Sequence, residues 1–91
     1  MALRWTSKAH SDLARIHAFL APVSPAAAAR VVKKILSAVK KLTRFPRLGV
    51  RLAEFDPREV RRLIVGDYEL RYEVRDADLF VLRLWHVHED R

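Results

Sequence analysis

The sequence contains no cysteine, which excludes a disulfide framework and a thiolate metal site. No apolar run approaches the roughly 18 residues that a membrane-spanning helix requires. The first residues, Met1 to Trp5, also lack the apolar stretch of a secretory signal peptide, so we expect a cytoplasmic protein without a membrane partner. With 91 residues we expect a single domain, residues 1–91, that has little room for an enclosed substrate cavity.

Acidic residues are almost absent from the first half of the chain. Residues 1–49 contain ten lysines and arginines against one acid, Asp12, which gives a net charge of +9. Residues 50–91 contain eight basic and ten acidic residues, which gives −2. The whole formal excess of +7 therefore lies in the first half. Such a patch attracts nucleic acid, an acidic protein segment or an anionic surface, and the charge alone does not select among them.

Two amphipathic helices are predicted in this basic half. The apolar residues of the first helix recur at spacings of four, three and four positions: Ala9, Leu13, Ile16 and Leu20. This helix is expected to begin at a Ser7 N-cap and to end near Ala21. Ser24 is then expected to cap a second helix, which begins at Pro25 and continues to about Phe45.

The second helix has the clearest pattern in the sequence. Its apolar side consists of Ala28, Val31, Val32, Ile35, Leu36, Val39 and Leu42. Its opposite side, which we call the basic ridge, consists of Arg30, Lys33, Lys34, Lys40, Lys41 and Arg44. A charged helix face is ordinarily only solvated, but a ridge of cations without one acid favours a partner such as a disordered acidic segment. Pro46 cannot continue the helix, and Gly49 can adopt the positive φ of a helix end.

The second half shows the patterns of β-strands. Four strands are expected in the whole chain: Leu3 to Thr6, Val60 to Val65, Tyr68 to Arg75 and Leu79 to Val87. The third alternates between apolar and charged residues, and the fourth is apolar on both faces except at Arg83, which is typical of a central strand. The predicted order is β-α-α-β-β-β, an α+β fold whose last three strands form an antiparallel meander.

Seven short motifs follow one another along nearly the whole chain. They are Trp5 and Ser7 with Asp12-Leu13-x-x-Ile16, Ser24-Pro25, Leu42-x-x-Phe45-Pro46-x-x-Gly49, Val60-Arg61-Arg62-Leu63-Ile64-Val65, Tyr68-x-Leu70-x-Tyr72-x-Val74, Val81-Leu82-Arg83-Leu84-Trp85-His86, and Glu89-Asp90-Arg91. This series resembles the ParE/RelE superfamily, the toxins of bacterial type II toxin–antitoxin operons. The resemblance implies a small antiparallel sheet with an α-helical hairpin packed on one face. It also implies a cognate antitoxin, expected to be ParD-like and of the ribbon-helix-helix type.

Two activities are known within that superfamily. RelE-like members cut mRNA on the ribosome, whereas ParE-like members inhibit DNA gyrase and need no catalytic residues. Metal-free RNA cleavage requires a base, an acid and cations that stabilise the developing charge. RelE-like enzymes place an arginine directly after the tyrosine that begins the alternating strand, where this sequence has Glu69. They also carry a tyrosine beyond the last strand, and residues 73–91 contain none. The comparison favours the ParE-like branch, and we therefore expect gyrase to be the target. Direct binding of nucleic acid is expected only if the protein is a ribonuclease.

Two alternatives stay open. The ribonucleases have two basic residues on the strand before the alternating one; Arg62 matches one of them, but Val60 occupies the position of the other. Some RNA-cleaving relatives use a histidine where this chain has His86. A ribosome-dependent ribonuclease would therefore use His86 with Arg62 and Arg83. The other alternative is a non-toxic remnant that keeps only its affinity for the antitoxin.

The candidate residues fall into two sets. Contact with the target is assigned to Arg62, Arg83, Trp85 and His86, since arginine and tryptophan often carry interface energy. Contact with the antitoxin is assigned to Arg30, Lys33, Lys34, Lys40, Lys41, Leu13, Ile16 and Leu20. His86 and His88 could form half of a metal site, but no further ligand lies nearby in the sequence, so neither a metal nor a cofactor is expected.

Overall fold

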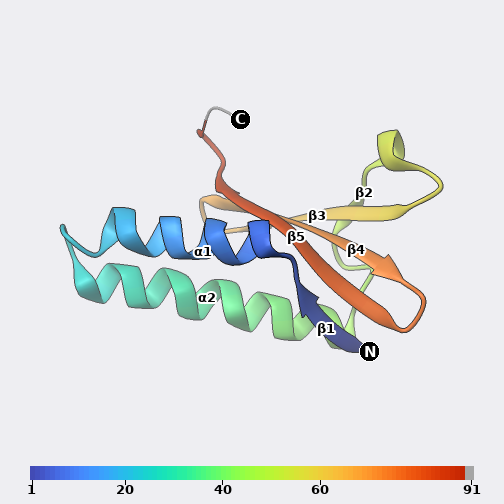
Figure 1. Ribbon diagram of the computed structural model, residues 1–91, viewed down its shortest axis with the longest axis horizontal. Helices are drawn as coiled ribbons and strands as arrows, with labels where there is room; N and C mark the ends of the chain where they lie inside the picture. Colours follow the sequence, from blue (N-terminus) through green and yellow to red (C-terminus); the bar gives the residue numbers. More distant parts are fainter. Residues whose placement is uncertain (90–91) are drawn as a thin grey trace.

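The computed structural model describes residues 1–89, and these residues form a two-helix hairpin and one five-stranded sheet. The elements are β1 (Ala2–Trp5), α1 (Ser7–Leu20), α2 (Pro25–Arg44), β2 (Val50–Arg51), the 3-10 helix η1 (Ala53–Phe55), β3 (Glu59–Val65), β4 (Tyr68–Arg75) and β5 (Asp78–His86). The two helices lie side by side, and the long strands cross beside them (Figure 1). The predicted α+β fold is confirmed, and the two-residue strand β2 is an addition to it. Asp90 and Arg91, which end the last sequence motif, lie outside the described residues.

The strand order is β1-β5-β4-β3-β2. The pairs among β2, β3, β4 and β5 are antiparallel, as expected of strands joined by short connections, but β1 pairs with β5 in parallel. The sheet is therefore mixed. The last strand, predicted to be central, is an interior strand along its first half, where β5 lies between β1 and β4; the strand at the centre of the sheet is β4.

Both helices begin at side-chain caps. The predicted cap of α2 is confirmed, since Ser24 Oγ accepts a hydrogen bond from Ala27 N at 3.1 Å. The predicted cap of α1 is wrong by one residue. Thr6 Oγ1 accepts from Ala9 N at 3.0 Å, and Ser7 is already helical. Thr6 takes this position because its backbone is still extended, and its N–H donates to Val81 O of the neighbouring strand.

β5 contains a bulge that changes which side chains face the helices. Arg83 is opposite Arg71, but the next pair along the strands is Val81 with Tyr72, so Leu82 is one extra residue on β5. Val81 and Leu84, three positions apart, can both be buried in the core because of this extra residue. The residues after the bulge resume their alternation with Arg83 on the opposite face from Leu84.

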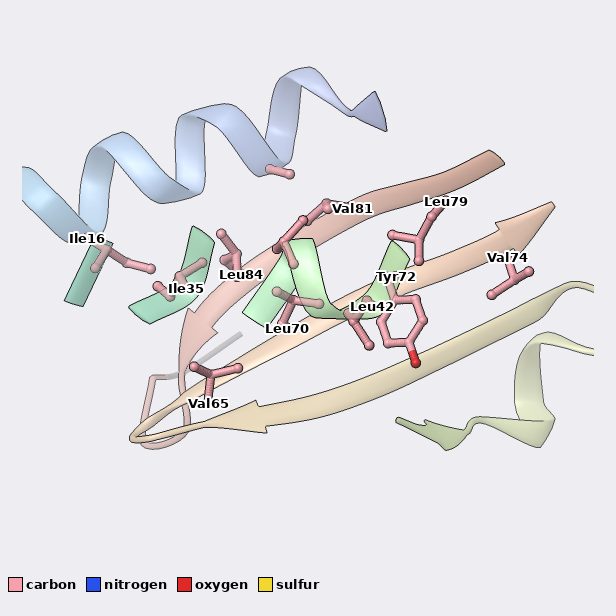
Figure 2. Packing of buried hydrophobic residues seen from close by; sticks show 12 residues of the cluster. Ile16, Ile35, Leu42, Val65, Leu70, Tyr72, Val74, Leu79, Val81 and Leu84 are labelled. Carbon is pink, nitrogen blue, oxygen red and sulfur yellow. The ribbon is translucent and has the colours of Figure 1, made fainter. Parts of the chain in front are cut away.

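The core lies between the hairpin and the inner face of the sheet. Figure 2 shows Ile35 and Leu42 of α2 packed over Leu70, Tyr72 and Leu84 of the central strands. A contiguous apolar cluster of this kind, with no disulfide, is what holds a domain of this length together.

The Tyr72 hydroxyl of β4 forms hydrogen bonds with the segment that follows α2. Tyr72 Oη accepts a hydrogen bond from Gly49 N at 2.9 Å and donates to Pro46 O at 2.7 Å. A Cβ at residue 49 would lie 2.6 Å from Arg62 O and 2.7 Å from Tyr72 Oη. The prediction of a positive φ at Gly49 is wrong, since the glycine with that conformation is Gly66 in the β3–β4 turn. Gly49 is needed for the close approach of two backbones.

Candidate interaction surfaces

The sheet face opposite the helices, which we call the open face, carries three arginines in a straight row. Arg62 of β3 lies opposite Arg71 of β4, and Arg71 lies opposite Arg83 of β5. Directly opposed side chains project from the same face of a sheet, and neighbouring strands are about 4.8 Å apart. These three residues, the arginine row, therefore span about 10 Å.

Two aromatic rings lie against Arg71 and Arg83 of the row. The Arg71 guanidinium carbon lies 4.8 Å from the centroid of the Trp85 ring and 5.3 Å from that of Phe55 in η1. The Arg83 guanidinium carbon lies 5.7 Å from the same Trp85 ring. Cation–π attraction offsets part of the repulsion between like charges that face one another across strands. Trp85 is itself buried beneath the guanidinium groups.

The carboxylates of the open face lie below the arginines. Glu69 and Glu73 project from the same side of β4 as Arg71, and both are buried. Glu73 accepts hydrogen bonds from Arg58 at 2.8 Å and from Arg75 at 3.2 Å. The bond from Arg58 holds the Glu73 pKa below its ordinary value, against the opposing effect of burial. Arg62, by contrast, is exposed, and within residues 1–89 its guanidinium makes no hydrogen bond or ion pair.

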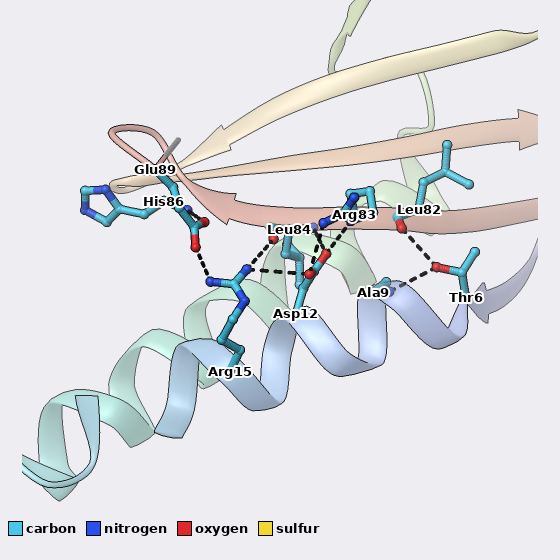
Figure 3. A network of polar contacts seen from close by, with 9 residues as sticks. All are labelled: Thr6, Ala9, Asp12, Arg15, Leu82, Arg83, Leu84, His86 and Glu89. Atoms are coloured by element: carbon cyan, nitrogen blue, oxygen red, sulfur yellow. Dashed lines mark hydrogen bonds and ion pairs between the residues drawn. The ribbon is translucent and has the colours of Figure 1, made fainter. Parts of the chain in front are cut away.

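One carboxylate joins α1 to β5. Asp12 Oδ2 accepts from Arg83 Nε at 2.8 Å and from Leu84 N at 2.9 Å (Figure 3). Burial alone would raise the Asp12 pKa, but the hydrogen bonds from Arg83 and Leu84 outweigh it, so the pKa lies below its ordinary value. The one acid of the basic half is thus a buried link between helix and sheet.

Asp12 belongs to a set of side chains that occupy the place of a strand. β1 ends at Trp5 and leaves the second half of the β5 edge without a neighbouring strand. Thr6 Oγ1 donates to Leu82 O at 2.9 Å, Asp12 accepts from Leu84 N, and Glu89 Oε2 accepts from His86 N at 3.1 Å (Figure 3). Arg15 in turn forms an ion pair with Glu89. The backbone groups of this edge are therefore satisfied by side chains.

The helical hairpin carries a second candidate surface. All members of the basic ridge are exposed. Beside the ridge, a shallow depression of about 460 Å³, the outer groove, is lined by Ala29, Val32 and Leu36 between the side chains of Lys33 and Lys40. An apolar floor between two lysines fits an amphipathic segment with acidic flanks.

A larger depression of about 630 Å³, the end groove, lies where α1 meets the β3–β4 turn and the end of β5. Its apolar wall consists of Ile16, Phe19, Leu20 and Val31. Phe19 is 80% exposed, which leaves a large aromatic side chain in water at the rim. His86 also lines this groove and packs edge-on against Tyr68, with the ring centroids 5.3 Å apart.

The structure brings together three of the four residues assigned to the target. Arg62, Arg83 and Trp85 share the open face, whereas His86 points to the other side, into the end groove. The three residues of the ribonuclease alternative, His86, Arg62 and Arg83, are therefore divided between two faces. Arg71 and Phe55 of the open face were not anticipated. The alternation along β4 does place Arg71 on its charged side, but the register that aligns it with two other arginines cannot be derived from one strand.

The residues assigned to the antitoxin are also divided. The five cations lie along the ridge, and Leu20 lies in the end groove. Leu13 is half-buried against the core, and Ile16 is almost entirely buried although it forms part of the wall of the end groove. Residues 1–89 contain no cluster of three or more histidine, aspartate or glutamate side chains placed to bind a metal. Neither helix in that range has both the length and the apolar character to cross a bilayer.

The chain resembles known toxins over nearly all of its length. The family model described as the ParE toxin of the type II toxin–antitoxin system parDE matches residues 3–91. Toxin RelE2 of Caulobacter vibrioides is 34% identical over 82 residues, which is 90% of either chain. Putative toxin Y4kP of Sinorhizobium fredii is 34% identical over 89 residues, covering 96% of this chain and 88% of that protein. A solved structure, the chromosomal ParDE system from P. aeruginosa, matches with a TM-score of 0.79 and 27% identity, covering 94% of this chain and 95% of the other.

Proposed function

Because the chain belongs to the ParE toxin family of type II toxin–antitoxin systems, we propose that it inhibits DNA gyrase through its open face and is kept inactive by a ParD-like antitoxin. The observation that carries this proposal is the separation of His86 from the arginine row. Cleavage of RNA needs proton-transfer groups and cations around a single phosphate. Here the arginines and Trp85 form a surface suited to binding, and the histidine lies on the other face.

A second candidate is favoured by the name of one relative. The similar protein from Caulobacter vibrioides is called RelE2. The RelE-like members of the superfamily that the sequence resembles cut mRNA on the ribosome. In this chain Glu69 occupies the position of an arginine of those enzymes, and it is buried within 3.4 Å of Arg71. A buried carboxylate therefore stands at the position where a ribonuclease would have a cation.

Inhibition of DNA supercoiling by gyrase tests the proposal. We expect the purified toxin to inhibit supercoiling, and Arg62→Gln to raise the concentration needed for half-inhibition about tenfold, the effect of losing one exposed interface arginine. Arg51→Gln is the matched control. Arg51 is an exposed arginine of the neighbouring strand β2, where it lies opposite Arg61 and away from the row, and the variant should inhibit like the wild type.

Three results would separate the alternatives. An active gyrase together with truncated mRNA on translating ribosomes would establish the ribonuclease and contradict the proposal. Normal growth after induction of the toxin without its antitoxin would indicate a remnant that only binds the antitoxin. Inhibition of gyrase that Arg62→Gln leaves unchanged would move the target contact away from the open face.

We further propose that the antitoxin binds the hairpin through an amphipathic, acidic helix. The outer groove offers apolar residues between Lys33 and Lys40, and the end groove adds Phe19 and Leu20 at the tip of the hairpin. A partner segment that uses both grooves crosses the basic ridge, where acidic side chains gain from its uncompensated charge.

The affinity of the antitoxin tests this contact. Lys33→Glu combined with Lys40→Glu should weaken binding at least about tenfold, mainly by slowing association, and should reduce the dependence of affinity on salt. Lys8→Glu with Arg4→Glu makes the same change of charge on exposed residues outside the ridge, and it should alter the affinity less than about twofold. Equal losses in the two variants, measured by biolayer interferometry, would mean that only the overall charge matters.

A further inference from the structure

We propose that the arginine row binds the phosphodiester backbone of a nucleic acid. In the setting of the proposed function, this backbone is the DNA held by gyrase, so the toxin contacts DNA as well as protein. That role rests on gyrase being the target, whereas the binding site itself does not. The sequence suggested nucleic-acid contact only for a ribonuclease, and the cross-strand register of the arginines is what changes this interpretation.

Each arginine of the row keeps donors for a ligand. Arg83 uses Nε and Nη2 for Asp12, and Arg71 uses Nη2 for Glu69, so within residues 1–89 the Nη1 atom of each makes no hydrogen bond. The Arg62 guanidinium is unengaged within the same range and exposed. The side chains of Arg71 and Arg83 are 25% and 41% exposed. Planar guanidinium groups with free edges are the side chains best suited to phosphate oxygens.

Two members of the row, Arg71 and Arg83, are held in place before any ligand arrives. Phe55 and Trp85 enclose the Arg71 guanidinium, and Asp12 holds Arg83 from the side of α1. Like charges on directly opposed residues repel one another, and Glu69, Asp12 and the Trp85 ring offset part of that repulsion. A ligand that bridges the three strands would relieve that repulsion and, of the three side chains it binds, would have to order only Arg62.

A linear polyanion fits this surface better than an acidic protein does. Specific protein interfaces usually depend on an apolar anchor at their centre. The central ring of the open face, Trp85, is only 4% exposed and is covered by arginines, so the middle of the face offers no such anchor. The exposed apolar residues of this face, Val50 and Ile64, lie at its edge beside Arg62. The row instead presents cations at the regular spacing of neighbouring strands, and Glu69 and Glu73 lie buried beneath them. No proton-transfer histidine accompanies the row, because His86 lies on the other face. Binding without cleavage is therefore expected.

Fluorescence anisotropy with a labelled 20-base-pair DNA duplex, and with a single-stranded RNA of matching sequence, tests the site on the whole protein. Arg62→Gln with Arg71→Gln should weaken duplex binding at least about tenfold and reduce the slope of log affinity against log salt by about two. Arg62→Gln alone, which changes an exposed side chain and preserves the fold, should reduce the slope by about one. Lys33→Gln with Lys40→Gln removes the same charge from the basic ridge and should change binding less than about twofold.

The outcomes distinguish this inference from the proposed function. Loss of duplex binding in the ridge variant but not in the row variants, or no binding by the wild type, would overturn the inference even if gyrase is inhibited. Row variants that bind the duplex like the wild type but fail to bind gyrase subunits in the absence of DNA would also overturn the inference. That result would indicate that the arginine row binds an acidic protein surface. Row-dependent binding of RNA in preference to DNA would support the phosphodiester site and contradict gyrase as the target.

Discussion

Replacing Asp12 with alanine should lower the free energy of unfolding by about 3 kcal/mol, a large part of the stability of a domain this small. The carboxylate is buried, and it is the acceptor for both the Leu84 N–H and the Arg83 guanidinium. Alanine would leave a buried backbone donor unsatisfied and would release Arg83 from α1. Urea denaturation followed by circular dichroism measures the loss.

Two matched variants separate the contributions to this effect. Asp12→Asn keeps an oxygen that can accept from Leu84 N but removes the charge opposite Arg83, and we expect a loss of about 1–2 kcal/mol. Asp78→Ala removes a carboxylate whose ion pair with Arg4 is exposed, and it should cost less than about 0.5 kcal/mol. Equal losses for Asp12→Ala and Asp78→Ala would show that α1 does not depend on the buried link.

The same carboxylate gives stability a dependence on pH. The Asp12 pKa is lower in the folded protein than its ordinary value of about 3.9, so the ionised form stabilises the fold above that pH. This contribution disappears as the pH falls through the lowered folded-state pKa. The difference in unfolding free energy between wild type and Asp12→Asn should therefore be constant above about pH 5 and should shrink towards about pH 2.

Leu42→Ala should lower the free energy of unfolding by about 3 kcal/mol, because the side chain is fully buried between α2 and the sheet and alanine leaves a cavity. Leu36→Ala makes the same chemical change six residues earlier on α2, where the side chain is 46% exposed in the outer groove. Leu36→Ala should lower the free energy of unfolding by less than about 1 kcal/mol, but it should weaken binding of the antitoxin. Thermal unfolding and binding measured on the same preparations would check both expectations. A larger loss of stability at Leu36 would mean that α2 presents a different face to the sheet.

The helices could be predicted because their signals are local. The apolar stripe of α2 and the Ser24-Pro25 start lie within one element, and the structure confirms both. The exposure of the basic ridge follows from the same periodicity. The N-cap of α1 was misplaced because Thr6 and Ser7 can both cap a helix and serine is the stronger cap in isolation. The choice between them depends on where the pairing with β5 ends, and Val81 is 75 residues away from Thr6 in the sequence.

The candidate surface on the sheet could be predicted only in part, because its geometry is set by contacts between strands. Arg83 and Trp85 alternate correctly on a single strand, so their shared face was apparent. The bulge at Leu82 was not, since nothing near Leu82 marks an extra residue. The register that aligns Arg62, Arg71 and Arg83 depends on two turns and that bulge together. The role of Asp12 was missed for a similar reason, since the partners that link it to the sheet, Arg83 and Leu84, lie more than 70 residues along the chain.

The position of β5 between β1 and β4 has a consequence for the synthesis of this toxin. Of the five strands β1 leaves the ribosome first, yet within residues 1–89 its only neighbour in the sheet is β5, the last of the five to be translated. A nascent chain can form the hairpin by local contacts, but β1 remains without a pairing partner until β5 has emerged, and pairing over such a sequence distance is slow. Until β3 and β4 have also emerged, the apolar side of α2 has no sheet to cover it. Antitoxin already present in the cell could therefore meet the helices of the toxin before the open face exists.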